Sequence, residues 1–124
     1  MSRTRTISVT VNKISGDVFD SILTLPPKII PNAKITSDGW WNFIRSYSKS
    51  KLKFHQNKSL GVLDHEYVDQ EFSWNIPICV ISNCTTSEII ITLKKPAQLS
   101  DLQFDQRVSI ISNVVTSMKN LLES

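Results

Sequence analysis

Residues 100–123 read SDLQFDQRVSIISNVVTSMKNLLE, and this stretch decides the fold. Its apolar residues recur every three or four positions, which is the period of an amphipathic α-helix. Ser100 and Gln103 form a capping box at its start, and Asp101 is favourably placed in the first turn. The sequence predicts a helix about 36 Å long, whose apolar face must lie against another layer of structure. The apolar stripe consists of Phe104, Val108, Ile111, Val115, Met118 and Leu122, widened by Ile110, Val114 and Leu121.

Most of the chain before this helix shows the alternation of apolar and polar residues that is typical of β-strands. The first strand is predicted over residues 6–11, where Ile7, Val9 and Val11 share one face. Pro77 interrupts the longest later strand and, because proline cannot donate a ladder hydrogen bond, it predicts a bulge, an edge or a bend. The later strands are predicted over residues 40–44, 51–55, 60–65, 72–80 and 88–93.

A short helix is predicted after the first strand, over residues 16–25. Ser15 is placed as its N-cap, and Pro26-Pro27 ends it. Residues 28–39 are expected to form a loop or a weak edge strand. This order of elements predicts an α+β fold. In it, a curved antiparallel β-sheet grips the long C-terminal α-helix, and a short N-terminal helix follows the first strand.

The length of 124 residues and the hydrophobic content of 40% fit one domain, residues 1–124, with a single core. No stretch has the roughly 18 continuous apolar residues of a membrane span, and the N-terminus lacks the apolar block of a secretory signal. We therefore expect a cytoplasmic protein. Cys79 and Cys84 match no redox or zinc spacing, so buried reduced thiols are predicted, with a disulfide across a turn as the alternative.

The charged residues are sorted along the chain, although the net charge is only +3. No acidic residue lies between Asp38 and Asp64. Neighbouring antiparallel strands of opposite charge are expected to pair across their solvent face. A nucleic-acid surface needs a more basic domain with aromatic or arginine-rich interleaving, so no nucleic-acid partner is expected. The basic residues of the interval are Arg45, Lys49, Lys51, Lys53 and Lys58, and the acidic group that follows is Asp64, Glu66, Asp69 and Glu71.

Five segments carry a resemblance to a known family: SGDVFDSI (15–22), LGVLDH (60–65), WNIPICV (74–80), SEIIITL (87–93) and the final helix. With the order of elements, they resemble the START-like, or SRPBCC, helix-grip superfamily, especially small bacterial and archaeal members labelled polyketide-cyclase-like. The resemblance covers the fold and implies a bent antiparallel sheet around the C-terminal helix, with a cavity between them. The region between the first helix and Trp40 is compressed, so we expect the family's second small helix to be reduced or missing.

The sequence contains no hydrolase elbow, phosphate-binding loop or dinucleotide-binding motif, and only three glycines. Its two histidines and two cysteines lack a metal-ligand spacing, so neither a metal nor a cofactor is expected. His65 lies between Asp64 and Glu66, but neighbours in a strand point to the opposite face, and no partner for acid-base chemistry is identified. His55 is on the lysine-bearing face of its strand, where we expect it to be exposed.

Candidate ligand-binding residues are inward-facing aromatic and apolar side chains, together with a few polar groups that fix a ligand's orientation. For each aromatic residue the alternative is an ordinary core position. Arg107 is expected to meet a ligand carboxylate or an acidic strand residue. Trp40 and Trp41 face opposite sides of a strand, so at least one is expected at a rim, a partner surface or a second core. The candidates are Trp41, Phe54, His65, Trp74, Phe104, Arg107, Val108 and Ile111.

Three functions are compatible with these residues. The leading hypothesis is a binding module, with weak catalysis or none, that holds a small apolar or amphipathic molecule between the sheet and the final helix. The second is an enzyme of the cyclase or dehydratase kind, in which His65, Asn75 or Arg107 positions a substrate or a water molecule. The third is an interaction domain without a ligand, a homodimer that uses Trp40 or Trp41.

Overall fold

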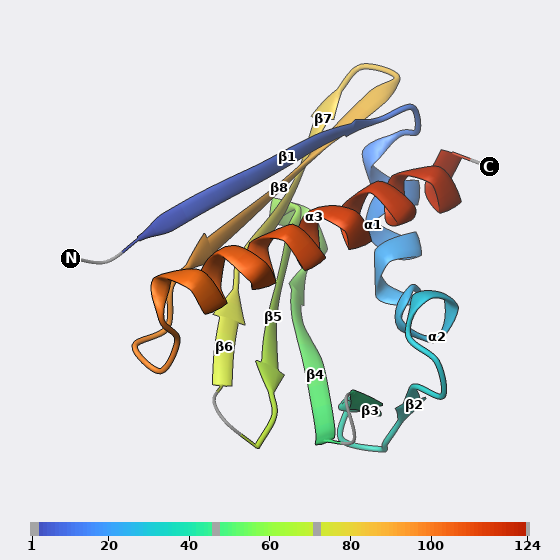
Figure 1. Cartoon of the computed structure of the whole chain (residues 1–124). Coiled ribbons are helices and arrows are strands. Elements are labelled where there is room, and N and C mark those ends of the chain that lie inside the picture. Colours follow the sequence, from blue (N-terminus) through green and yellow to red (C-terminus); the bar gives the residue numbers. More distant parts are fainter. Residues whose placement is uncertain (1–2, 46–47, 71–72, 124) are drawn as a thin grey trace.

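The computed structural model describes residues 3–45, 48–70 and 73–123, and in them it shows an eight-stranded antiparallel sheet with a long helix across one face (Figure 1). The predicted α+β fold is confirmed. The strands are β1 (Thr4–Val11), β2 (Lys34–Ile35), β3 (Trp41–Arg45), β4 (Ser48–Asn57), β5 (Val62–Val68), β6 (Ser73–Ile76), β7 (Ile78–Asn83) and β8 (Thr86–Lys94). The helices are α1 (Ser15–Leu23), α2 (Pro26–Ile29) and α3 (Asp101–Glu123), and a 3-10 turn, η1 (Lys58–Leu60), precedes β5.

The sheet has the strand order β1-β8-β7-β5-β4-β3-β2, and β6 pairs with β5. In Figure 1, α3 crosses one face of this sheet, while α1 and α2 lie beside the C-terminal half of α3. The core lies between the two layers, because alternate residues of the strands point towards the helix. Its most deeply buried apolar side chains are Val11, Val18, Leu63, Ile89, Leu93 and Phe104.

The start of α3 is held by its own capping box and by β1. The Ser100 N–H donates to Gln103 at 2.8 Å, and the Gln103 N–H donates back to the Ser100 hydroxyl at 3.2 Å, as the sequence predicts. Arg3 donates to Asp105 at 2.9 Å, and its guanidinium lies 5.6 Å from the centroid of the Phe104 ring. These contacts fix the first turns of α3 against the sheet.

The end of α3 is held by the last residues of β1 and by the loop that follows it. The Lys119 ammonium donates to the Thr10 carbonyl, and the Asn12 N–H donates to the Glu123 carboxylate at 2.8 Å. The Asn12 amide, followed by Lys119, lowers the pKa of the Glu123 carboxyl. Although α3 has 23 residues, neither it nor another helix in the described part of the chain is long and apolar enough to cross a membrane.

Pro77 divides the longest predicted strand into β6 and β7. β6 pairs with β5, whereas β7 pairs mainly with β8 from Ile78 onward, so the strand changes partner at the proline. Asp64 of β5 then accepts a hydrogen bond from the Ile78 N–H at 3.1 Å. This change of partner is the bend that Pro77 predicts. Phe72, the first residue of that predicted strand, lies outside the described residues.

The N-terminal helical region differs from the prediction. α1 begins at Ser15, and Ile14 occupies the N-cap position without a side-chain cap, so Ser15 as N-cap is wrong. Pro26 does not only end α1 but begins a second helix, α2, because proline lacks the N–H that the first turn of a helix leaves unpaired. α2 has four residues, which is the reduced form of the second helix that the family resemblance implies. The weak edge strand of residues 28–39 is β2.

The predicted burial of the two cysteines is wrong, because both are free and exposed. Cys79 lies between buried Ile78 and Val80 in β7, so its side chain points to the opposite, solvent-facing side of the sheet. Cys84 occupies the turn between β7 and β8 and has a φ of 58°.

The solvent face of β4 and β5 brings the sorted charges together. Lys53 lies opposite Glu66 in the register of the two strands, and the His55 Nε2 atom lies 3.6 Å from a Glu66 carboxylate oxygen. Lys51 and Lys53 also lie over the Trp40 ring, with their Nζ atoms 4.4 and 5.9 Å from its centroid. His55 is exposed, as expected. Glu71 of the acidic group lies outside the described residues.

Gly61 connects η1 to β5 with a φ of 69°, and a Cβ atom there would lie 2.4 Å from the Val80 carbonyl oxygen. The Gly61 carbonyl accepts the Val80 N–H at 2.8 Å, so the two segments cannot move apart without loss of that hydrogen bond. We predict that Gly61→Ala lowers the free energy of unfolding by about 2 kcal/mol or more, as measured by urea denaturation.

Gly16 supplies the control, because it lies in α1 and a Cβ atom there meets nothing within 4 Å. Gly16→Ala is expected to leave stability unchanged or to raise it by up to about 1 kcal/mol, since alanine is the better helix former. Equal effects of the two substitutions would contradict the close approach of Gly61 to β7.

Candidate ligand-binding site

A cavity of about 400 Å³ lies between α3 and the sheet. Its walls come from the concave face of the sheet and from all three helices, and its lining is apolar except for His65, Tyr67, Trp74 and Arg107. The sheet contributes Phe43, Ile44, Leu52, Phe54, His65, Tyr67, Trp74, Ile76, Ile78 and Ile91. The helices and the turn after α2 contribute Ile22, Leu25, Pro26, Ile29, Ile30, Pro31, Arg107, Ile110, Ile111, Val114, Val115 and Met118.

The cavity reaches the surface between α3 and β3. Exposed lining side chains mark this edge: Ile44 by 70%, Ile110 by 42% and Val114 by 41%, and Pro31 after α2 is exposed as well. An apolar molecule that enters at this edge therefore meets apolar side chains from the rim to the floor.

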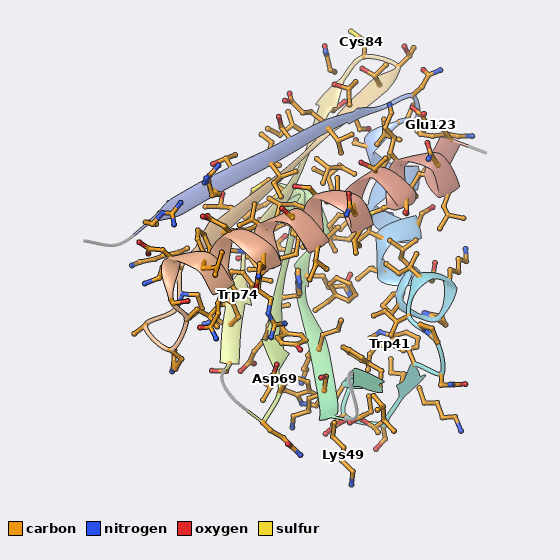
Figure 2. All side chains as sticks on the ribbon, in the orientation of Figure 1. Trp41, Lys49, Asp69, Trp74, Cys84 and Glu123 are labelled. Carbon is orange, nitrogen blue, oxygen red and sulfur yellow. The ribbon has the colours of Figure 1, made fainter. Side chains whose placement is uncertain are left out.

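Trp74 forms one end of the cavity, beneath the N-terminal part of α3 (Figure 2). Its Nε1 donates to the Lys94 carbonyl at 2.8 Å, and its ring packs edge-on against Phe104 with 6.3 Å between centroids. The indole N–H is thus paired within the protein, and the ring presents apolar surface to the cavity.

A cluster of polar side chains surrounds Asp69, the buried acidic residue that follows β5 (Figure 2). The Tyr67 hydroxyl donates to Asp69 at 2.9 Å and lies 3.3 Å from the Ser50 hydroxyl. The Arg107 guanidinium extends from α3 to within 3.8 Å of the same carboxylate. Of the two predicted partners of Arg107, the structure contains the acidic strand residue, so the only formally charged lining side chain is compensated among the described residues.

His65 lies on the floor of the cavity, between Phe54 of β4 and Ile76 of β6 in the register of the sheet. Its ring centroid is 5.7 Å from that of Phe54. Burial lowers the pKa of His65 to about 4, against the smaller opposing effects of the Asp64 charge and the Leu63 backbone. The imidazole is therefore neutral at pH 7 and can act as a hydrogen-bonding group without charge.

Solved structures show the same arrangement of a sheet around a C-terminal helix. An uncharacterised protein from Bacillus thuringiensis matches with a TM-score of 0.78 at 15% identity, over 98% of this chain and 100% of that chain. A START superfamily protein from Mycobacterium smegmatis has a TM-score of 0.69 at 8% identity, over 97% of both chains. An aromatase/cyclase from Streptomyces has a TM-score of 0.67 at 9% identity, over 99% of this chain and 94% of that chain.

The chain has the START-like helix-grip fold. At these low identities the structural likeness establishes the fold and not a shared activity. No protein-family model and no curated protein matches the sequence.

Five of the eight predicted site residues line the cavity of this helix-grip fold: Phe54, His65, Trp74, Arg107 and Ile111. The other three lie outside its lining. Phe104 is fully buried under Arg3 and Trp74, and Val108 is part of the packed layer beside it. Trp41 is half-buried near α2, at the outer end of the sheet (Figure 2).

The prediction missed most of the aliphatic lining. Leu52 and Tyr67 lie two residues from Phe54 and His65 in the same strands, so the same alternation could have identified them. No sequence signal pointed to Ile29 or Ile30, because Pro26-Pro27 was interpreted only as the end of a helix. Asn75, a candidate of the enzyme hypothesis, is exposed in β6 and does not line the cavity.

We predict that His65 makes folding sensitive to acid. In the unfolded chain its pKa is near the ordinary value of 6.5, whereas in the folded protein it is about 4, so between these values the unfolded state binds more protons. Stability is therefore lost as pH falls through this window, by up to about 3 kcal/mol at pH 4. Urea denaturation at pH 7 and pH 4 should show a smaller loss in His65→Leu than in the wild type.

His55→Leu is the matched control, since His55 is exposed on the other face of the sheet. We expect its loss of stability between the two pH values to equal that of the wild type. A His65→Leu variant with the same acid sensitivity as the wild type would show that His65 is not buried in its neutral form.

Proposed function

We propose that residues 1–124 act as one helix-grip domain that holds a small apolar or amphipathic molecule between α3 and the sheet. The observation that supports this function is the cavity of about 400 Å³ with its almost entirely apolar lining. Small-molecule sites in proteins typically have volumes of about 300–1,000 Å³, apolar walls and a few polar groups that fix orientation. Protein interiors otherwise contain few voids larger than a water molecule.

The charges around the cavity favour a ligand without net charge. Arg107 is paired with Asp69, and His65 is neutral at pH 7 because burial lowers its pKa to about 4. An ionic group placed on this floor would lose its hydration and gain no unpaired opposite charge there. The polar part of an amphipathic ligand is therefore expected to be uncharged and to lie beside a polar lining side chain or at the rim.

The structure supports binding more than acid-base catalysis. A general base works best when its pKa is near the working pH, and a pKa of about 4 makes His65 a weak base at pH 7. Asn75, which the enzyme hypothesis also needs, lies on the exposed face of β6. The cavity thus offers positioning and exclusion of water, while a suitable proton acceptor is not evident among its described lining residues.

The first test compares the protein's native mass with its denatured mass, followed by organic extraction. We expect a reproducible additional mass that is lost on denaturation, or binding of the uncharged fluorescent probe N-phenyl-1-naphthylamine to protein without such a mass. The native mass also gives the oligomeric state. The homodimer hypothesis requires a mass of two chains.

A filled cavity gives the decisive variant. Ile111 of α3 lines the cavity, so Ile111→Trp is expected to weaken binding of N-phenyl-1-naphthylamine by at least about tenfold, measured by fluorescence titration. Ile81→Trp is the control, because Ile81 is an exposed residue of β7 outside the lining, and its affinity should equal that of the wild type. Absence of probe binding and of any co-purified mass would refute the proposed function, as would equal binding by the two variants.

A further inference from the structure

His65 differs from the other polar side chains of the cavity in the hydrogen bonding of its outer ring nitrogen, Nε2. Tyr67 donates to Asp69, Trp74 donates to Lys94, and Arg107 is paired with Asp69. By contrast, the Leu63 backbone acts on the His65 imidazole, while Nε2 of that ring makes no hydrogen bond to the described residues. Polar groups in apolar surroundings are nearly always hydrogen-bonded, so an Nε2 atom without a partner among the described residues indicates a partner supplied from outside the chain.

The two ring nitrogens of His65 have different surroundings. Nδ1 is buried and out of reach of a ligand, whereas the residue as a whole is only partly buried and lines the cavity. Nε2 is therefore the nitrogen that can meet a molecule in the cavity. Phe54 and Ile76 flank the ring in the neighbouring strands, so the contact is made in apolar surroundings, where a hydrogen bond is stronger than in water.

The position of the proton on the neutral ring decides which chemical group fits. The Leu63 backbone, two residues earlier in β5, favours a proton on the imidazole. Nδ1 is the ring nitrogen nearer to the strand's backbone, so the N–H is favoured at Nδ1, and Nε2 is left with its lone pair. A lone pair requires a hydrogen-bond donor on the ligand.

We propose that the ligand is an uncharged apolar molecule with a hydroxyl group, which donates a hydrogen bond to Nε2 of His65. This inference rests on the proposed function and adds the chemical class of the ligand. A hydroxyl fits because it is neutral at pH 7 and donates a short hydrogen bond. A carboxylate at the same place would have to lose its hydration beside Phe54 and Ile76.

The test uses two probes of nearly the same shape, 2-naphthol and 2-methylnaphthalene, which differ in a hydroxyl against a methyl group. We expect the wild-type protein to bind 2-naphthol about 3- to 10-fold more tightly, measured by isothermal titration calorimetry at pH 7. In His65→Leu this preference should disappear through a loss of 2-naphthol affinity, while 2-methylnaphthalene binds as tightly as before or more tightly.

Two further variants separate the hydrogen bond from changes in packing. His65→Asn keeps a polar side chain at the position and is expected to retain part of the preference for 2-naphthol. His55→Leu makes the same substitution at the exposed histidine of the neighbouring strand and should leave both affinities unchanged. Thermal unfolding of each variant establishes that it is folded before it is titrated.

The possible outcomes distinguish this inference from the proposed function. If the wild type binds both probes equally, or if the preference for 2-naphthol survives in His65→Leu, the cavity binds apolar molecules but His65 does not select a hydroxyl. Tighter binding of 2-naphthaldehyde than of 2-naphthol would show that His65 donates instead of accepting, and would overturn the proposed ligand class. Failure of the wild type to bind any of these probes would contradict the proposed function, and this inference with it.

Discussion

The attachment of both ends of α3 to β1 and its flanking residues is the constraint on which the rest of the structure depends. At one end Arg3 pairs with Asp105 and covers the Phe104 ring, and at the other the Asn12 amide and the Thr10 carbonyl bind the side chains of the last turns. Because both ends are fixed, the middle of the helix crosses the face of the sheet between them. These end contacts hold the helix over the sheet together with the buried side chains of α3 in between, such as Val115 and Met118.

The residues between the two ends are too small to fill that space. Aromatic rings pack together, Trp74 against Phe104 and Phe43 against Tyr67, and Tyr67 lies opposite Trp74 in the register of β5 and β6. The middle of α3 presents mainly isoleucine and valine to the cavity. Among the described lining residues Tyr67, Trp74 and Arg107 have partners in the protein, whereas Nε2 of His65 in β5 has none. The result is an apolar, nearly neutral space, which favours an uncharged apolar molecule over an ion.

The sequence predicted the elements that depend on local periodicity. The four-three spacing from Phe104 and the Ser100–Gln103 capping box placed α3 to within one residue, and alternation placed the strands. It failed where tertiary contacts decide. Pro26 reads as a stop signal but begins α2. The burial of Cys79 was predicted wrongly for another reason, because the general preference of cysteine for the interior was followed where the alternation of its strand places it outward.

The cavity was harder to predict than the fold because alternation shows which face a residue occupies but not whether another side chain covers it. Phe104 and Ile111 belong to the same stripe, yet Arg3 and Trp74 enclose Phe104 while Ile111 faces open space. Trp41 has the inward register of its strand but lies at the outer end of the sheet, beyond the span of the cavity lining. These differences depend on where α3 crosses the sheet, which no local pattern encodes.

The central claim, that small apolar molecules bind between α3 and the sheet, is tested most directly by methyl NMR of protein labelled at the isoleucine δ1 carbons, with and without N-phenyl-1-naphthylamine. Isoleucines lie both in the cavity, as Ile76, Ile91 and Ile111, and on the outer surface, as Ile14, Ile35 and Ile81. The account predicts that the probe shifts the resonances of the cavity group and leaves the surface group unchanged. Shifts confined to the surface group, with the cavity group unmoved, would contradict it.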